Sequence, residues 1–317
     1  MKGVVGRLPE DQTKPLLKIG TAPVNWNNND LPDWRPAIPF PEILDSMLDA
    51  GFLETEWDES FGANVDALNQ ELQRREMSFT GAYRWFDFLD EHRFGRDIET
   101  TRSLLQTLQD IGVRHLIVSD RLREHRVACS GFVPIDGSVS LDSLGYATIA
   151  ANLARLADLT QPYDLSVHYH NHAGTYIETA EEIELLISRL DLAIVDLCFD
   201  TGHYAFGGGD ALGFIKEHTG SIGYLHLKDV DPEVLELAKA NRLSFLDALR
   251  QYIFCPLGEG NARVPEIVDH LVKGHFGNYV IIEQDTCRGD ATENGRRNLS
   301  TIQSIVSAVA PNRRSAR

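Results

Sequence analysis

Short apolar or β-branched segments alternate with amphipathic segments along almost the whole chain of 317 residues, and this repeat limits the possible folds most. Each apolar segment has the length of a strand, and each is followed by a segment with helical periodicity. Helical crossovers of this length join parallel strands through right-handed connections. Eight such units in a row predict a single closed (β/α)8 barrel of the α/β class. The expected strands are 16–23, 53–58, 78–84, 114–120, 165–171, 193–200, 222–229 and 279–284.

A doubly wound sheet is the alternative arrangement for alternating strands and helices. It usually carries a glycine-rich phosphate-binding turn after its first strand, whereas residues 22–26 of this chain read A-P-V-N-W. No proline- or glycine-rich linker divides the sequence, so one domain over residues 1–317 is expected. Within it, residues 230–256 are expected to form a helical insertion after the seventh strand. Residues 1–15 and 310–317 are expected to form an N-terminal extension and a C-terminal tail.

The charge of the chain excludes several classes of partner. There are 47 acidic and 30 basic side chains, which gives a net charge of −17. A nucleic-acid or anionic-membrane binder needs clustered lysine and arginine, so neither partner is expected. The four cysteines form no C-x-x-C pair and the N-terminus has no apolar stretch, which is typical of a cytoplasmic protein with reduced thiols.

Ionisable residues gather at the carboxyl ends of the expected strands. In a barrel these ends meet on one face, where catalytic groups come from several strands at once. Five of the eleven histidines lie at the ends of the fifth, sixth and seventh strands, so this face is the expected site. The strand-end residues are Glu54, Glu56, Arg84, His168, His170, His172, Asp200, His203, His226, Lys228, Asp229 and Glu283.

Alternation along the fifth strand places His168, His170 and His172 on one face. With Asp200, His226 and Glu283 they make a mixed set of nitrogen and oxygen donors. Such a set suits Mn²⁺, Co²⁺, Fe²⁺ or Zn²⁺ better than Mg²⁺ or Ca²⁺, which prefer oxygen ligands. The sequence therefore predicts a divalent-metal site at the carboxyl ends of these strands.

The motifs at these strand ends resemble the xylose-isomerase-like TIM-barrel superfamily of sugar isomerases and epimerases, and within it the inosose dehydratases of myo-inositol catabolism. D-T-G-H at 200–203 and H-L-K-D at 226–229 are shared across the superfamily. The H-x-H-x-G-T stretch at 170–175 and the segment 229–248 are more specific to the dehydratase branch. The similarity extends from about Lys18 to about Gln284. The loops 121–139, 255–261 and 285–298 differ from the dehydratase pattern, and loops on this face select the substrate.

The resemblance implies one divalent metal ion held by four residues, at strands five to eight. Epimerases of the superfamily carry a glutamate at strand five, whereas this chain has His170, which favours the dehydratase branch. Mn²⁺ or Co²⁺ is the expected metal, with Fe²⁺, Zn²⁺ and Mg²⁺ as further options, and no organic cofactor is expected. The implied ligands are His170, Asp200, His226 and Glu283.

The expected reaction is the dehydration of a 2-keto-inositol to a cyclic diketone, through an enediolate that the metal stabilises. His172 and His203 are the candidate acid and base. Glu56 and Lys228 are expected to orient hydroxyls or to donate to the leaving oxygen. The candidate substrate-binding residues are Asn25, Trp26, Arg84, Trp85 and Glu178, of which the two tryptophans could stack on a polyol ring.

Four alternatives remain open on the sequence. A sugar isomerase or epimerase would use the same metal and differ only in the second step. A lyase acting on 3-keto-glycosides would expel an aglycone instead of water. A metal-dependent DNA-repair endonuclease is disfavoured by the net charge of −17. A non-catalytic sugar-binding barrel is disfavoured by the complete ligand set. The expected ligand is a small neutral polyol or keto-sugar, and a homo-oligomer is one option for the assembly.

Overall fold

Eight parallel strands close into a barrel in the computed structural model, which describes residues 16–314, with side chains to residue 309. Around the barrel their order is β1-β10-β7-β6-β5-β4-β3-β2. All eight strands expected from the sequence are present, so the barrel prediction is confirmed. The expected extension 1–15 lies outside the described residues. The strands are β1 (Lys18–Thr21), β2 (Glu54–Trp57), β3 (Ser78–Phe86), β4 (His115–Asp120), β5 (Ser166–His170), β6 (Val195–Asp200), β7 (Ile222–Leu227) and β10 (Tyr279–Ile282).

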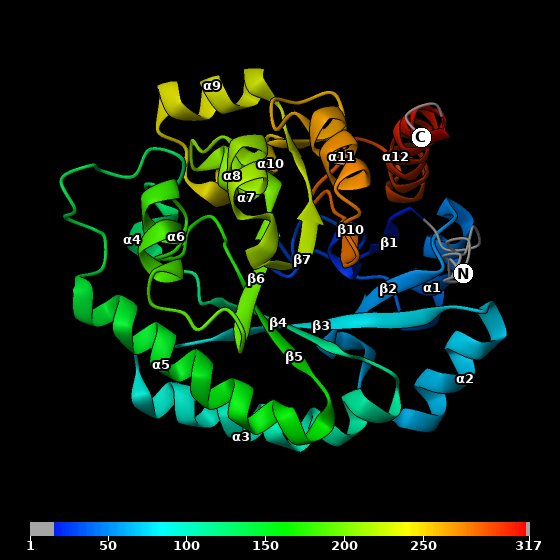
Figure 1. Ribbon diagram of the computed structural model, residues 1–317, viewed down its shortest axis with the longest axis horizontal. Coiled ribbons are helices and arrows are strands. Elements are labelled where there is room, and N and C mark those ends of the chain that lie inside the picture. Colours follow the sequence, from blue (N-terminus) through cyan, green and yellow to red (C-terminus); the bar gives the residue numbers. More distant parts are fainter. Residues whose placement is uncertain (1–15, 315–317) are drawn as a thin grey trace, which may run out of the picture.

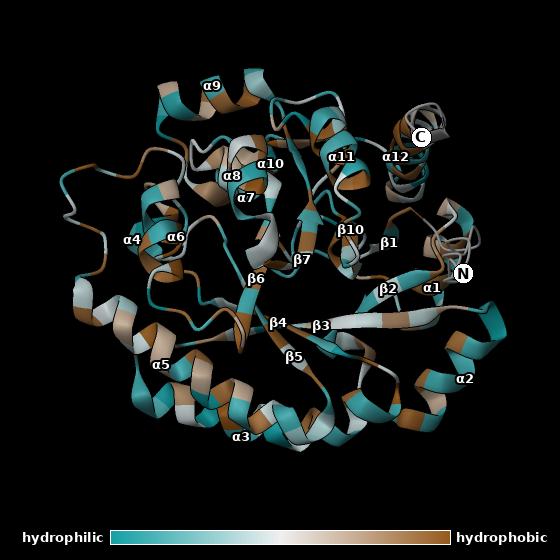
Figure 2. Cartoon of the chain, viewed as in Figure 1, coloured by the Kyte–Doolittle hydropathy of each residue, from teal (hydrophilic) through white to brown (hydrophobic). Residues whose placement is uncertain are grey.

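Helices surround the barrel, with α3 and α5 side by side along one edge and α11 beside α12 (Figure 1). The outer helices mix hydrophobic and hydrophilic residues along their length (Figure 2), as expected when one face packs on the strands and the other meets water. The helices are α1 (Phe40–Ala50), α2 (Val65–Arg75), α3 (Glu91–Asp110), α4 (Glu124–Val127), α5 (Ser143–Thr160), α6 (Ala180–Ile187), α7 (Thr201–Phe206), α8 (Ala211–His218), α9 (Pro232–Asn241), α10 (Phe245–Arg250), α11 (Val264–Lys273) and α12 (Ala291–Arg314). Short 3₁₀ turns lie at Pro23–Asn25, Glu59–Phe61, Gln161–Tyr163 and Thr219–Ser221.

Two helices begin earlier than the apolar periodicity indicates. The sequence pattern places their starts at 97 and 297, whereas α3 begins at Glu91 and α12 at Ala291. The side chain of Asp90 accepts hydrogen bonds from the backbone of His92 and Arg93, so it caps α3 before the apolar stripe starts. At the other end of the chain, α12 continues to Arg314, so the expected tail begins inside this helix.

The segment after β7 carries α9 and α10 and a small ladder that the sequence did not indicate. Strands β8 (Asp229–Val230) and β9 (Phe254–Cys255) pair antiparallel and bring the ends of this segment together. The carboxylate of Asp229 accepts hydrogen bonds from four backbone N–H groups, those of Val230, Gly258, Gly260 and Ala262. Asp229 therefore fixes the P-L-G-E-G loop beside the barrel mouth.

The interior of the barrel holds a small apolar layer, separate from the larger core between strands and helices. Ala22, Ile117, Cys198, Tyr224 and Ile281 form this inner cluster. Ionisable side chains lie above it, at the carboxyl ends of the strands. Within residues 16–314, no helix is long and apolar enough to cross a membrane.

Candidate metal centre and active site

The four expected metal ligands come together at the carboxyl end of the barrel. His170 ends β5, Asp200 ends β6, His226 lies near the end of β7 and Glu283 directly follows β10. One ligand atom from each lies within 4.8 Å of those of the other three, and all four side chains are buried. Because residues two apart on a strand share a face, the inward register of four adjacent strands produces this group.

Several buried atoms of this group have no hydrogen-bond partner among the described residues. They are Oδ2 of Asp200, Nδ1 of His226 and both ring nitrogens of His170. Buried polar atoms are almost always hydrogen-bonded, so a cluster of unpaired donor atoms calls for an explanation. Burial also lowers the pKa of His170 to about 4, which keeps its imidazole neutral, as a metal ligand must be. The donor set, two imidazoles and two carboxylates, fits a divalent metal ion.

Glu56 lies on the far side of His226 from the other ligands. Its Oε1 is 2.8 Å from Nε2 of His226, while Nδ1 of the same ring is 3.1 Å from Oε2 of Glu283. Burial raises the pKa of Glu56. A carboxylate on the outer nitrogen of a metal-binding histidine fixes the orientation and tautomer of the ring. Glu56 is therefore placed to orient His226, and because it also lines the pocket, the role toward substrate hydroxyls stays a prediction.

Replacing Glu56 by glutamine is expected to weaken divalent-metal binding by roughly 10- to 100-fold, the usual effect of losing such a partner. The amide keeps the shape but lacks the charge that supports the His226 ring. Isothermal titration of the metal-stripped variant with Mn²⁺ measures the change. Glu54, on the same face of β2 but beside Tyr279 at the opposite end of the barrel, supplies the control E54Q. Equal affinity of E56Q and E54Q would contradict the assigned role.

Lys228 is buried among the acidic groups. Its Nζ lies 2.6 Å from Oδ1 of Asp285, 3.1 Å from Oε2 of Glu283 and 3.3 Å from Oδ2 of Asp200. The charges of these carboxylates outweigh burial and hold the pKa of Lys228 well above its usual value. A side chain at Gly202 would meet Cβ of Lys228 at 2.6 Å, so the glycine of D-T-G-H lets the lysine lie against α7.

His172 and His203 lie beside the metal group with ring centroids 3.8 Å apart, but their surroundings differ. Both nitrogens of His172 face acceptors, the carbonyl of Ala173 at 2.8 Å and Oδ2 of Asp30 at 3.3 Å. Burial opposes its charge, but the Asp30 carboxylate outweighs burial and raises the pKa of His172.

Both nitrogens of His203 face donors instead. The N–H of Ala173 is 3.3 Å from Nδ1, and Nζ of Lys228 is 3.1 Å from Nε2. Burial, together with the positive charges of His172 and Lys228, holds the pKa of His203 well below its usual value. The pKa values of the two imidazoles thus shift in opposite directions, upward for His172 and downward for His203.

A pocket opens above this group and encloses about 560 Å³, part of it open to solvent. Trp85 lines one wall, with its ring edge-on to His172 at 4.9 Å. Of the residues expected from the sequence, the pocket contains Glu56, Trp85, His170, His172, His203, His226, Lys228 and Glu283.

Asn25 and Trp26 lie outside the pocket, so the hydroxyl-binding and stacking roles expected for them are corrected. The amide of Asn25 donates to the carbonyl of Ile282 and accepts from the N–H of Gln284, which ties the end of β1 to that of β10. Trp26 is buried in the core, with its indole N–H donating to Thr292. Both residues are structural.

Arg84 is also corrected, and strand alternation gives the reason. It neighbours Trp85 on β3, so the two side chains point to opposite faces. Trp85 faces the barrel interior, whereas Arg84 points to the helices, where Nε donates to Thr101. The ion pair of Arg84 with Glu59 is 3.5 Å long.

Glu178 is the fourth corrected residue, because its carboxylate is already saturated. It accepts hydrogen bonds from the backbone of Gly131 and Gly174, both at 2.7 Å, and from the hydroxyl of Ser130 at 2.8 Å. These bonds hold the loop after β4 against the loop after β5. Glu178 therefore supports the rim and does not contact the pocket.

His168 shares the inward face of β5 but lies one layer too deep to join the metal group. Its Nε2 is 2.9 Å from Nδ1 of His115, and its Nδ1 bonds Asp196. Asp30 and Asp285 line the pocket, but no role was predicted for them from the sequence. None was predicted for Cys198, beneath the metal group, either. Asp285 was detectable, since it lies two residues after Glu283 and must share its face. Asp30 was not, since a loop carries it.

The comparisons with known proteins agree with this geometry. A family model described as xylose isomerase-like TIM barrel matches residues 41–304. The chain belongs to the xylose isomerase-like TIM barrel family. Two proteins named inosose dehydratase are 30% identical to this chain, one from Clostridium perfringens over 274 residues and one from Bacillus thuringiensis over 271 residues. In both cases the match covers 85% of this chain and 90% of the relative, which confirms the resemblance and the expected kinship to dehydratase enzymes.

Solved structures of the same family share the fold at low identity. The probable 3-DHS dehydratase from Bacillus anthracis has a TM-score of 0.70 at 14% identity, over 90% of this chain and 99% of that one. The IOLI protein, whose structure holds a zinc atom, has a TM-score of 0.68 at 14% identity, over 92% and 99%. At this identity the likeness shows the fold alone.

Proposed function

We propose that the chain is a divalent-metal-dependent hydro-lyase that removes water from a cyclic keto-polyol, with 2-keto-inositol as the favoured substrate. The observation that carries the proposal is the buried group of His170, Asp200, His226 and Glu283, whose ligand atoms lie within 4.8 Å of one another and include both nitrogens of His170 without a hydrogen bond. The name of the dehydratase relatives and the zinc in the IOLI structure support it.

A divalent ion held by these four residues supplies a Lewis acid for the ketone oxygen of the substrate. The chain itself supplies the proton transfers. Removing the proton next to the ketone needs a neutral base, and His203 is held neutral by its surroundings.

Loss of the hydroxyl group then needs an acid. His172 carries a proton on Nε2, beside Asp30, and lines the pocket. Donation of that proton to the departing oxygen releases water. Lys228 keeps the carboxylates around the site neutralised while the proton moves, and Trp85 provides an apolar wall for the ring of the substrate. The strongly acidic chain suits a neutral polyol better than a polyanion.

Product analysis tests this assignment directly. The metal-reconstituted protein is incubated with 2-keto-myo-inositol and a panel of ketoses, and products are followed by NMR. We expect a dehydrated cyclic diketone from the inosose, with ultraviolet absorbance from its enol. An epimer of unchanged mass would show an epimerase instead, and the absence of turnover would refute the proposed enzymatic activity.

Replacing Asp30 by asparagine is expected to move the alkaline limb of the kcat/KM profile to lower pH. The Asp30 carboxylate raises the pKa of His172, so without it the imidazolium loses its proton at lower pH and the acid is lost earlier. The acidic limb, set by the base, should move little. Asp58, another pocket aspartate, supplies the control D58N. Coincident profiles for D30N and D58N would contradict the assignment of His172.

Two neighbouring residues give a paired test of the pocket. Trp85→Ala is expected to raise KM by about tenfold, equivalent to about 1.4 kcal/mol, because it removes the ring wall. Arg84→Ala should leave KM unchanged, since Arg84 points to the helices. Steady-state kinetics of both variants measure the difference. A larger rise in KM for R84A than for W85A would contradict the placement of Trp85 in the pocket and of Arg84 against the helices.

A further inference from the structure

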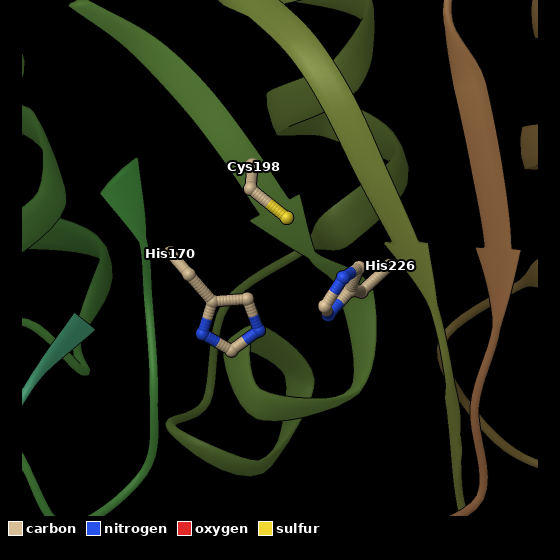
Figure 3. A group of neighbouring side chains, drawn as sticks. All are labelled: His170, Cys198 and His226. Atoms are coloured by element: carbon tan, nitrogen blue, oxygen red, sulfur yellow. The ribbon is translucent and has the colours of Figure 1, made fainter. Parts of the chain in front are cut away.

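A thiol lies directly beneath the proposed metal position. Cys198 is two residues before Asp200 on β6, so both side chains point into the barrel and the thiol lies one layer deeper. The ligand atoms of His170, Cys198 and His226 lie within 4.8 Å of one another, and all three residues are buried. Figure 3 shows the sulfur of Cys198 directed toward the gap between the two imidazole rings.

This deeper group shares two members with the catalytic group. His170 and His226 belong to both, whereas the remaining ligands are carboxylate oxygens above and a sulfur below. Both positions draw on the same two imidazole rings, so we expect an ion at one position to disfavour an ion at the other. Hard ions such as Mn²⁺ prefer the oxygens, and thiophilic ions prefer the sulfur.

Charges near the site can balance either position. When an ion occupies the deeper group, Asp200 and Glu283 lose their metal, but Nζ of Lys228 lies 3.3 Å and 3.1 Å from their carboxylates. Glu56, 2.8 Å from His226, adds a negative charge beside the deeper ion. The Cys198 thiol gives its proton to the buffer when the sulfur binds.

We propose that His170, Cys198 and His226 form a second, deeper position for the thiophilic ion Cd²⁺, which displaces the catalytic metal and blocks turnover. The block rests on the proposed function, whereas the binding position does not.

Spectroscopy of Cd²⁺ binding to the metal-stripped full chain tests the position independently of activity. A variant with Cys129, Cys255 and Cys287 replaced by serine leaves Cys198 as the sole thiol. We expect one Cd²⁺ per chain with a near-ultraviolet thiolate-to-metal band in this variant and in the parent. Cys198→Ser should lose the band, and its Cd²⁺ affinity should fall by more than the roughly 10- to 100-fold that losing an outer partner costs.

Asp200→Asn separates the two positions. It should lose Mn²⁺ and keep the Cd²⁺ band, because Asp200 is absent from the deeper group. Cd²⁺ bound to the triple-serine variant without a thiolate band, or no Cd²⁺ binding to it, would overturn the proposal even if Cys198→Ser does not fold. Neither result bears on the proposed dehydratase activity. That proposal would fail if the protein showed no Mn²⁺-dependent turnover.

Discussion

Asp200→Asn is expected to abolish turnover and retention of the catalytic metal together, while the barrel stays folded. The substitution removes one of two anionic ligands from the group formed with His170, His226 and Glu283. Metal Lewis-acid stabilisation is worth several kcal/mol, so kcat should fall by roughly 10²–10⁴-fold.

The fold should survive because asparagine keeps the cap of α7. Oδ1 of Asp200 accepts the N–H of His203 at 2.8 Å, and an amide oxygen can accept the same bond. Elemental analysis, kinetics and circular dichroism on one preparation measure the three properties. Asp196, on the same strand and face but bonded to His168, supplies the control D196N, which should retain metal. Full activity in D200N would contradict the ligand assignment.

Lys228→Met is expected to destabilise the metal-free protein strongly and to be rescued by a divalent metal. The ammonium lies within 3.3 Å of three buried carboxylates, those of Asp200, Glu283 and Asp285. Removing one partner of a buried ion pair costs about 3–5 kcal/mol. A metal ion neutralises Asp200 and Glu283 in its place, so added Mn²⁺ should raise Tm more in the variant than in the parent.

Thermal unfolding with and without Mn²⁺ measures both effects, and methionine keeps the length of the side chain. Exposed Lys216 on α8 supplies the control K216M, which should unfold like the parent. A K228M protein with the parent's Tm in the absence of metal would show that the lysine carries no charge in this site.

Residues set by strand register were the most predictable part of the site. Alternation on β5 placed His168, His170 and His172 on the inward face. The choice of His170, together with Asp200, His226 and Glu283, came from the family resemblance. The alternation of side chains along a strand also places Arg84 and Trp85 on opposite faces of β3, and His168 one layer below His170 on β5.

Residues set by long-range hydrogen bonds could not be predicted. Asn25 forms hydrogen bonds with backbone groups of Ile282 and Gln284, which are more than 250 positions away in the sequence. The sequence shows only a polar residue in a turn at the expected site, and therefore wrongly indicates a substrate-binding role. Asp30 reaches His172 from a loop whose path no periodicity defines. Properties that depend on such pairs, including the opposite pKa shifts of His172 and His203, can be seen only in the folded chain.

We propose that four strand-end residues hold the divalent ion on which dehydration depends. Turnover of 2-keto-myo-inositol, measured together with the metal content of the same preparation, is the decisive test. We expect no turnover in protein stripped of metal, and recovery in proportion to Mn²⁺ or Co²⁺ occupancy, up to one ion per chain. Full turnover in a preparation that elemental analysis shows to be free of metal would contradict it.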